Sequence, residues 1–296
     1  MTPTLAITLG DPRGIGPEIV RAVLQQRGGQ DCVVIGPDDL VRDLPARTIG
    51  TGSWEGGGAD PLRLAGRLTG EAVARAVELW RAGEAQAIVT GPGDKRALHE
   101  AGFLFPGHTE MLRDLTGAER VVMMLASDRL RVALITTHLA LRDALAILTP
   151  ERIVQTAELV RRYLVDWFGI AQPRLALCAV NPHAGEGGLF GREELDVMAP
   201  AARTAGITGP LPADTVFVRA MKGEFDAVLA PYHDVGMTAI KVASFGKGVN
   251  VTLGLPVPRT APDHGTALDI AGRGLADAGS MHEAVRMARA IAERLG

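Results

Sequence analysis

Three of the seven histidines in the sequence follow directly on apolar runs of strand length. His138 ends the segment VALITTH, His183 comes after LALCAVNP, and His233 ends VLAPY. In open α/β sheets, ligand sites form beyond the carboxyl ends of the strands, because the loops converge there. Neutral imidazoles from separate strands can share one divalent cation and still leave positions for substrate. The alternative is that each is a loop histidine bonded to backbone, since no close spacing such as HxxxH marks a local metal site.

A second group of residues suits an anion. The segment FPGHTEML (105–112) is a loop that enters a helix, where free backbone N–H groups and the helix dipole favour a phosphate or carboxylate. His108 and Thr109 would add side-chain donors there. Further donors lie near strand or loop ends, although each cation among them could also be an ordinary solvated charge: Lys241, Asn250 and Arg259.

Continuous apolar runs are the elements that must position these side chains. Such runs, apolar on both faces, are typical of strands in a parallel sheet covered on both sides. Helical patterns lie between them, so the alternation predicts an α/β fold. The expected strands are 5–9, 32–35, 87–89, 121–125, 132–135, 175–180, 227–229 and 249–253, and the clearest helices are 71–82, 151–168 and 281–295.

Capping residues are expected at the starts of these helices. Thr69 and Thr149 are candidates for the first two, and Ser280 for the last. The glycine-rich stretch 51–61 predicts a surface loop.

The turn LGDPRGIGPEIV (9–20) passes from the first strand into a helix and invites a nucleotide-binding interpretation. Gly14 and Gly16 are not followed by the third glycine of the dinucleotide fingerprint, and no Gly-Lys-Ser/Thr ending makes a P-loop. A tight strand-to-helix turn is the simpler interpretation.

Composition and charge exclude several classes of protein. The 296 residues are 47% hydrophobic and 22% charged, with a net charge of -3. No basic stripe suits nucleic acid or anionic lipid, and no apolar run is long enough to span a membrane. Cys32 and Cys178 lie in apolar runs and are expected to be small buried residues of a reducing compartment. With no basic leader, we expect a cytoplasmic enzyme.

Several motifs in a fixed order resemble the PdxA family, the 4-hydroxythreonine-4-phosphate dehydrogenases of vitamin B6 synthesis. The resemblance covers nearly the whole chain and is carried by GDPRGIGPE (10–18), FPGHTE (105–110), TTH (136–138), NPHAGEGGLFG (181–191), YHDVGM (232–237) and VNVTLGLPVPRTAPDHGTALDIAGRG (249–274). Two motifs also resemble the isocitrate and isopropylmalate dehydrogenases, whose nicotinamide site is not a Rossmann site.

The resemblance implies a two-domain fold of the isocitrate/isopropylmalate dehydrogenase type, with largely parallel sheets and an active-site cleft between the domains. We expect one domain from residues 1–105 and 255–296, and a second from 106–254 with the metal ligands and dimer contacts. A homodimer with the active site at the subunit interface is implied as well.

The resemblance also implies roles for individual residues. The metal ligands would be His138, His183 and His233, holding Zn, Mg or Co. The substrate-binding residues would be His108, Thr109, Lys241, Asn250 and Arg259, with Lys241 and His108 as candidates for catalysis. A looser likeness assigns NAD or NADP to His264, Gly265, Thr266, Ala267 and Asp269.

The implied reaction is oxidation of 4-phosphohydroxy-L-threonine, followed by decarboxylation of the β-keto acid. The sequence departs from the family pattern at three positions, where most members are expected to have Asn, Gln and Ser: Asp94, Val235 and Ala261. These departures leave several substrates to be considered. The alternatives are another phosphorylated hydroxy acid such as D-threonate or D-erythronate 4-phosphate, a dihydrodiol carboxylate, an acyl or phosphoryl transferase on a related fold, or a metal-binding regulatory module.

Overall fold

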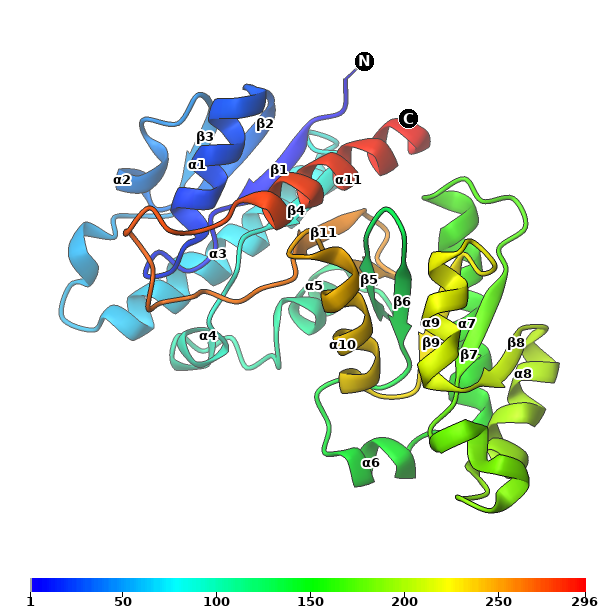
Figure 1. Cartoon of the computed structure of the whole chain (residues 1–296). Coiled ribbons are helices and arrows are strands. Elements are labelled where there is room, and N and C mark those ends of the chain that lie inside the picture. The colour runs from blue at the N-terminus through cyan, green and yellow to red at the C-terminus, as the bar shows by residue number, and fades with distance from the viewer. Residues whose placement is uncertain (1) are drawn as a thin grey trace. The chain divides into compact units, whose positions relative to one another are not determined.

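The computed structural model describes residues 2–296, and Figure 1 shows an α/β protein with helices packed on strands. The chain divides into two compact units. Unit 1 is formed by both ends of the chain, up to Val121 and from Val249 to Gly296, and unit 2 is the stretch Val122–Gly248.

Unit 1 contains six strands in the order β3-β2-β1-β4-β11-β10. All neighbours are parallel except β10 and β11, which are antiparallel. The strands are β1 (Leu5–Thr8), β2 (Gly29–Gly36), β3 (Ala46–Gly50), β4 (Ala87–Thr90), β10 (Val249–Leu253) and β11 (Arg259–Pro262). The helices are α1 (Gly16–Arg27), α2 (Asp38–Val41), α3 (Pro61–Arg81), α4 (Lys95–Glu100), α5 (His108–Thr116) and α11 (Gly279–Leu295), with a 3-10 turn at Glu55–Gly57.

The core of unit 1 forms where α3 and α5 meet the strands. Val73 and Val77 of α3 and Leu112 of α5 join the same cluster as Val33 and Ile88 from the strands, and each is at most 1% exposed. Burial of such side chains contributes roughly 1.5–3 kcal/mol apiece. This packing fixes the first turn of α5, which carries His108.

Unit 2 contains five strands in the order β5-β6-β9-β7-β8, with only β5 and β6 antiparallel. The strands are β5 (Val122–Ala126), β6 (Arg131–Leu134), β7 (Leu175–Cys178), β8 (Thr208–Leu211) and β9 (Ala227–Ala230). The helices are α6 (Leu141–Ala146), α7 (Pro150–Asp166), α8 (Ala199–Ala205), α9 (Ala213–Met221) and α10 (His233–Ser244), with a 3-10 turn at Pro182–Gly188 and a π turn at Glu194–Met198.

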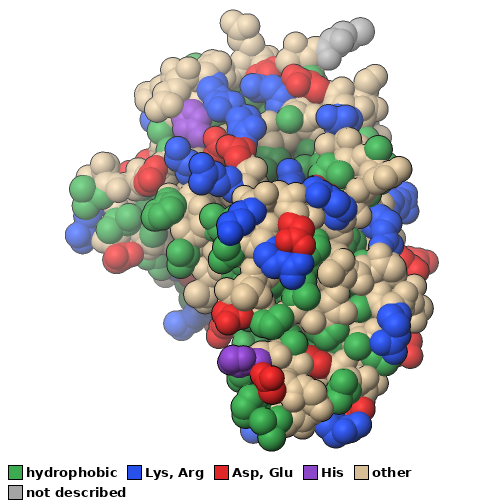
Figure 2. Space-filling model, turned by 45° about the vertical axis from the view of Figure 1, so that its right-hand side comes forward, with side chains coloured by type: hydrophobic (Ala, Val, Ile, Leu, Met, Phe, Trp, Pro, Cys, Tyr) green, Lys and Arg blue, Asp and Glu red, His purple; other side chains and the backbone are tan. Residues whose placement is uncertain are grey.

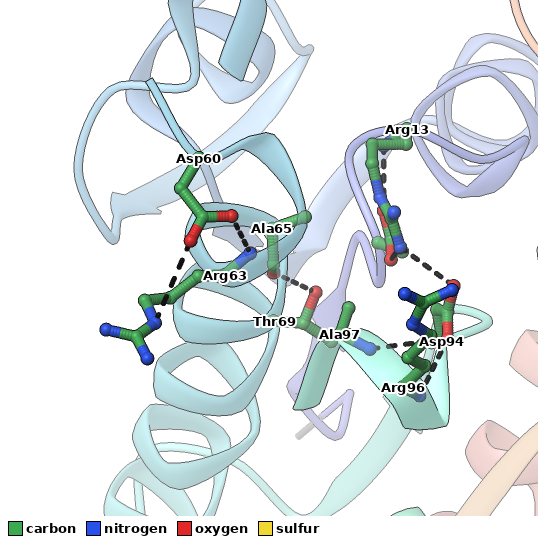
Figure 3. Close-up of polar contacts among 9 residues, drawn as sticks. Arg13, Asp60, Arg63, Ala65, Thr69, Asp94, Arg96 and Ala97 are labelled. Carbon is green, nitrogen blue, oxygen red and sulfur yellow. Dashed lines mark hydrogen bonds and ion pairs between the residues drawn. The ribbon is translucent and has the colours of Figure 1, made fainter. Parts of the chain in front are cut away.

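The strands expected from the sequence are confirmed, but two helix starts differ. α3 begins ten residues earlier than the pattern 71–82 suggested, because the Asp60 side chain caps it by accepting from the Arg63 N–H at 3.1 Å (Figure 3). Thr69 is therefore inside the helix, with its hydroxyl donating to the Ala65 carbonyl at 2.7 Å. Ser280 also lies inside α11, and its hydroxyl contacts Asp263 instead of capping.

The division between the units differs from the expected boundaries at residues 105 and 255. α5 belongs to unit 1, because Met111 and Leu112 are buried in that unit's core. β10 belongs there too, since its antiparallel pairing with β11 joins Val249 to Pro262. FPGHT is thus, as the sequence predicts, a loop that enters a helix, and it lies within unit 1.

The two cysteines are buried, as the sequence predicts. Cys32 and Cys178 are free and buried, and burial raises the pKa of each thiol to about 12. None of the helices in residues 2–296 is long and apolar enough to cross a bilayer. On the face shown in Figure 2, Lys and Arg side chains are interspersed with Asp and Glu.

Candidate active site

Two of the three strand-end histidines lie together in unit 2. β6 and β9 are parallel neighbours, with Leu134 opposite Ala230, so the residues that follow them emerge at the same sheet edge. The His138 and His233 rings have centroids 5.4 Å apart. Both line a pocket with a cavity volume of about 140 Å³, together with Thr136, Thr137, Leu139, Leu141, Ala144, Tyr232 and Asp234.

The local backbone presents these two imidazoles. His138 has a left-handed φ of 50°, which a non-glycine residue adopts only when its surroundings fix it. His233 is the first residue of α10, and its Nδ1 lies 2.6 Å from the Asp234 carboxylate. A protonated Nδ1 donating to this carboxylate leaves Nε2 as the atom available to a cation.

His183 lies in a different setting. It follows β7, the other neighbour of β9, in an exposed turn where its Nδ1 is 3.5 Å from Glu186 and its side chain is 69% exposed. Within residues 2–296, no three His, Cys, Asp or Glu side chains gather closely enough to hold a metal ion. One chain therefore brings together His138 and His233 but not His183, whose metal role stays a prediction.

The turn that carries His183 has an unusual backbone. Five consecutive residues, 183–187, have positive φ, and His183, Ala184 and Glu186 among them are not glycine. Left-handed conformation costs roughly 1–2 kcal/mol per L-residue. Such a turn persists only if neighbouring groups hold it.

Arg259 carries a buried positive charge in unit 1. Its side chain is 3% exposed and donates to the Thr90 and Thr252 hydroxyls, at 2.5 and 3.0 Å for the two terminal nitrogens. Burial lowers the pKa of this guanidinium to about 10, partly opposed by the charge of Glu110, so Arg259 remains a cation at neutral pH. Its hydrogen-bond partners are neutral hydroxyls, which leaves the charge suited to an anion.

His108 lies close enough to Arg259 to respond to its charge. It begins α5, and its Nε2 is buried without a hydrogen-bond partner. Burial, and secondarily the charge of Arg259, lowers the pKa of His108 to about 3, so the imidazole is neutral at pH 7. Thr109 follows on the same helix turn and is 8% exposed, and the Asn250 Oδ1 is another buried atom without a partner.

The unpartnered Nε2 of His108 lies at the start of α5, which no side chain caps. No side chain caps α5, so its first N–H groups remain available. A Cβ at Gly93 would lie 2.7 Å from the His108 Nε2, so a larger residue at position 93 would displace this ring from the loop after β4. Unpartnered buried polar atoms are costly unless a ligand or water satisfies them.

The loop of residues 264–269 packs on the glycine turn after β1. The Ile15 N–H donates to the Thr266 carbonyl at 2.9 Å, and a Cβ at Gly14 would lie 2.6 Å from that oxygen. Gly16 in turn faces the Leu9 carbonyl. The two glycines are therefore needed for close packing of the backbone on Thr266 and Leu9. This role does not require the spacing of a phosphate-binding fingerprint.

An ion-pair network not anticipated from the sequence adjoins this turn (Figure 3). Arg13 donates to the fully buried Asp11 with two nitrogens, at 3.0 and 2.7 Å, and to Asp94 at 2.8 Å. Asp94 also caps α4 by accepting from the Arg96 and Ala97 N–H groups. Arg13 and Asp94 are 81 positions apart, so no local sequence pattern predicts their ion pair.

The remaining predicted residues lie on α10 and in the loop of residues 264–269. Lys241 is exposed in the third turn of α10, eight residues after His233 and so about 12 Å further along the helix axis. His264 bonds through Nδ1 to the Gly265 carbonyl at 3.0 Å, while its Nε2 is buried without a partner. Ala267 has a left-handed φ of 43°, and Asp269 lies in the same loop.

Comparisons with known proteins agree with this architecture. The sequence matches the family model of the pyridoxal phosphate biosynthetic protein PdxA over residues 58–288. It is 44% identical to the 4-hydroxythreonine-4-phosphate dehydrogenase of Marinobacter nauticus, covering 98% of this chain and 95% of that protein. A protein of Bradyrhizobium diazoefficiens with the provisional name D-threonate 4-phosphate dehydrogenase is 42% identical, over 97% of this chain and 96% of its own.

Solved structures give the same result. The 4-hydroxythreonine-4-phosphate dehydrogenase of Klebsiella pneumoniae superposes with a TM-score of 0.87 at 38% identity, covering 98% of this chain and 99% of that one. A β-decarboxylating dehydrogenase of Thermococcus kodakarensis shares the fold, with a TM-score of 0.55 at 14% identity over 96% of this chain and 82% of that one.

The chain shares the α/β fold of a β-decarboxylating dehydrogenase. Within that fold class, the chain belongs to the PdxA family, an oxidoreductase family associated by name with pyridoxal phosphate biosynthesis.

Proposed function

We propose that the protein oxidises 4-phosphohydroxy-L-threonine with NAD or NADP, giving 2-amino-3-oxo-4-phosphooxybutanoate, which decarboxylates to 3-amino-2-oxopropyl phosphate. The proposal rests foremost on the adjoining imidazoles of His138 and His233 in a pocket at the carboxyl edge of a parallel sheet. The names and near-complete coverage of the relatives support the substrate.

The pair of imidazoles fits two ligands of a divalent cation. Their rings face one pocket, and the Asp234 contact leaves the His233 Nε2 available. We propose His183 as the third ligand, with Zn, Co or Mg as the metal. When bound, such a cation would act as a Lewis acid that stabilises negative charge on the reacting oxygen.

Unit 1 supplies groups suited to the phosphate of the substrate. Arg259 offers a cation whose protein partners are neutral hydroxyls, and α5 offers free N–H groups at its start. Neutral His108 can donate through one ring nitrogen, while Thr109 and Asn250 add further polar atoms. We propose Lys241 as a further substrate contact and as a candidate for proton transfer, together with His108.

We propose that the 264–269 loop binds the nicotinamide cofactor. Its support is the loop's fixed position on the glycine turn, through the Ile15–Thr266 hydrogen bond, and the buried, unpartnered Nε2 of His264. The cofactor would accept the hydride from the substrate carbinol carbon.

A second candidate substrate follows from the Bradyrhizobium relative, whose name gives D-threonate 4-phosphate. That acid carries the same phosphate and differs from 4-phosphohydroxy-L-threonine in having a hydroxyl in place of the amino group. Turnover of both acids, followed as nicotinamide reduction at 340 nm, will rank them, and the one with the higher kcat/KM is the preferred substrate.

His233→Ala is the direct test of the proposed site. Removal of one ligand of a catalytic cation should lower Zn²⁺ affinity at least about tenfold and lower kcat by about a hundredfold or more. The matched control is His99→Ala, because His99 is exposed in α4, its Nε2 lies 2.9 Å from the Phe105 carbonyl, and it does not line the His138–His233 pocket. Wild-type metal affinity and turnover in the His233 variant would refute the proposal.

We also propose that the working enzyme is cytoplasmic and that it is a homodimer. The dimer is supported by a set of large apolar side chains exposed on unit 2, which a partner subunit would cover. They include Leu189 at 72%, Val242 at 67% and Phe245 at 87% exposure.

A further inference from the structure

A carboxylate buried beneath the His183 turn has no place in the proposed chemistry. Glu194 is 3% exposed and begins the π turn at Glu194–Met198. Its Oε1 accepts from the Val180 and Asn181 N–H groups at 2.9 and 2.7 Å, and its Oε2 accepts from the Asn181 side-chain amide at 2.9 Å. Burial of a charged group is unfavourable unless it is hydrogen-bonded in this way.

These donors lie at the point where β7 ends. β7 runs to Cys178, and the Ala179 N–H still bonds to the neighbouring Leu211 carbonyl at 2.8 Å. The next two backbone N–H groups point to Glu194 instead of to a strand. The carboxylate thus takes over from the sheet as the acceptor and determines the direction in which the chain leaves β7.

The same carboxylate contacts the far side of the turn. A Cβ at Gly185 would lie 2.9 Å from the Glu194 Oε2, so the left-handed backbone of residues 183–187 is folded directly onto it. Asn181 is tied down twice, since its side-chain amide also donates to Glu193 at 2.7 Å. His183 lies between the hydrogen bonds of Asn181 and the close packing of Gly185 on the carboxylate.

We propose that Glu194 is a positioning residue for His183: by accepting hydrogen bonds at the start of the turn and packing against Gly185, it presets the imidazole for cation binding before any cation arrives. Without it, the turn would relax from its strained conformation, and binding would have to restore the order. The inference rests on the proposed role of His183 as a metal ligand. It concerns only residues of unit 2.

Glu194→Gln is the discriminating variant. Glutamine keeps the shape and one acceptor oxygen for the backbone N–H groups, but its own amide would face the Asn181 amide, donor against donor. Hydrogen–deuterium exchange of the metal-free protein should show residues 181–191 exchanging about tenfold faster or more, and calorimetric titration with Zn²⁺ should show affinity lowered by about tenfold to a hundredfold.

Asp196→Asn is the matched control, because Asp196 lies in the same π turn but is exposed and pairs with Arg192 at 2.9 Å. It should exchange and bind Zn²⁺ as the wild type does. Should Glu194→Gln bind Zn²⁺ with wild-type affinity, whether or not exchange is faster, the positioning role is overturned.

His183→Ala separates this inference from the function on which it rests. If His183→Ala loses Zn²⁺ binding while Glu194→Gln keeps it, only the positioning role fails. If His183→Ala binds Zn²⁺ as tightly as the wild type, the ligand role of His183 is wrong and the inference about Glu194 falls with it. Loss of affinity in both variants, with faster exchange in the second, supports both.

Discussion

His108 shows how burial changes the use of a single residue. With its pKa lowered to about 3, it is a neutral hydrogen-bonding group at pH 7, which suits the proposed contact with substrate better than a role as proton donor. A bound phosphate would oppose the effect of Arg259 and favour proton uptake by His108.

The same shift predicts a dependence of stability on pH. Between pH 6.5 and 3 the unfolded chain binds a proton at His108 and the folded chain does not, so the free energy of unfolding falls as the pH is lowered. His108→Gln should remove this contribution, up to about 1.4 kcal/mol per pH unit. Urea unfolding at pH 7.5 and 5.5 measures it.

His99→Gln is the control for this measurement, because His99 is exposed in α4. That variant should keep the wild-type change in unfolding free energy between the two pH values. A wild-type pH dependence in His108→Gln as well would show that His108 titrates normally in the folded protein.

At the scale of elements, the turn between β1 and α1 acts as a support for the 264–269 loop. Gly14 lets the two backbones meet, and Arg13 ties the turn to the cap of α4 through Asp94. Asp94 stands where Asn is expected in the family; an Asn side chain could keep one acceptor oxygen for the α4 N–H groups, whereas a carboxylate adds the charge that pairs with Arg13.

Gly14→Ala tests this support. The added Cβ would lie 2.6 Å from the Thr266 carbonyl oxygen, so the loop must shift. We expect a loss of about 1–3 kcal/mol in the free energy of unfolding, and a raised KM for the nicotinamide cofactor. Denaturant unfolding and steady-state kinetics measure the two effects.

Gln25→Ala on the exposed face of α1 is the matched control and should change neither quantity. If Gly14→Ala loses stability but keeps its KM for the cofactor, the 264–269 loop does not bind the nicotinamide.

At the scale of the whole molecule, α10 ends in an arrangement that a single chain does not explain. Phe245 is 87% exposed and has a left-handed φ of 47°, where glycine or asparagine is the usual residue. Neighbouring exposed apolar side chains are typical of interaction sites, and Val242, three residues earlier, is 67% exposed as well. This observation favours a homodimer that uses unit 2.

Phe245→Ser should weaken the dimer. Burial of a Phe side chain contributes roughly 1.5–3 kcal/mol, so the dimer dissociation constant should rise by about tenfold to a hundredfold. Sedimentation velocity over a range of concentrations measures it. Leu104→Ser, at a position 75% exposed in unit 1, is the control and should leave the dissociation constant unchanged. A monomeric wild-type protein would contradict the prediction.

The sequence by itself determined the family and eight of the eleven strands found in residues 2–296, whereas β3, β8 and β11 carry no long apolar run and were not predicted. A continuous apolar run such as Ala227–Ala230 is stable only as a strand covered on both faces, so its position can be predicted from the sequence. The motif GDPRGIGPE identifies the family from its order of residues alone. His138 and His233 were also predictable as a pair, because the ends of parallel strands share one edge.

Tertiary structure alone decided the groups that hold those motifs in place. Glu194 beneath the His183 turn, Arg13 between Asp11 and Asp94, and the neutral state of His108 depend on which distant segments meet and on how much water they exclude. Hydrogen bonding and desolvation act over a few ångströms in space, whereas sequence patterns report neighbours along the chain.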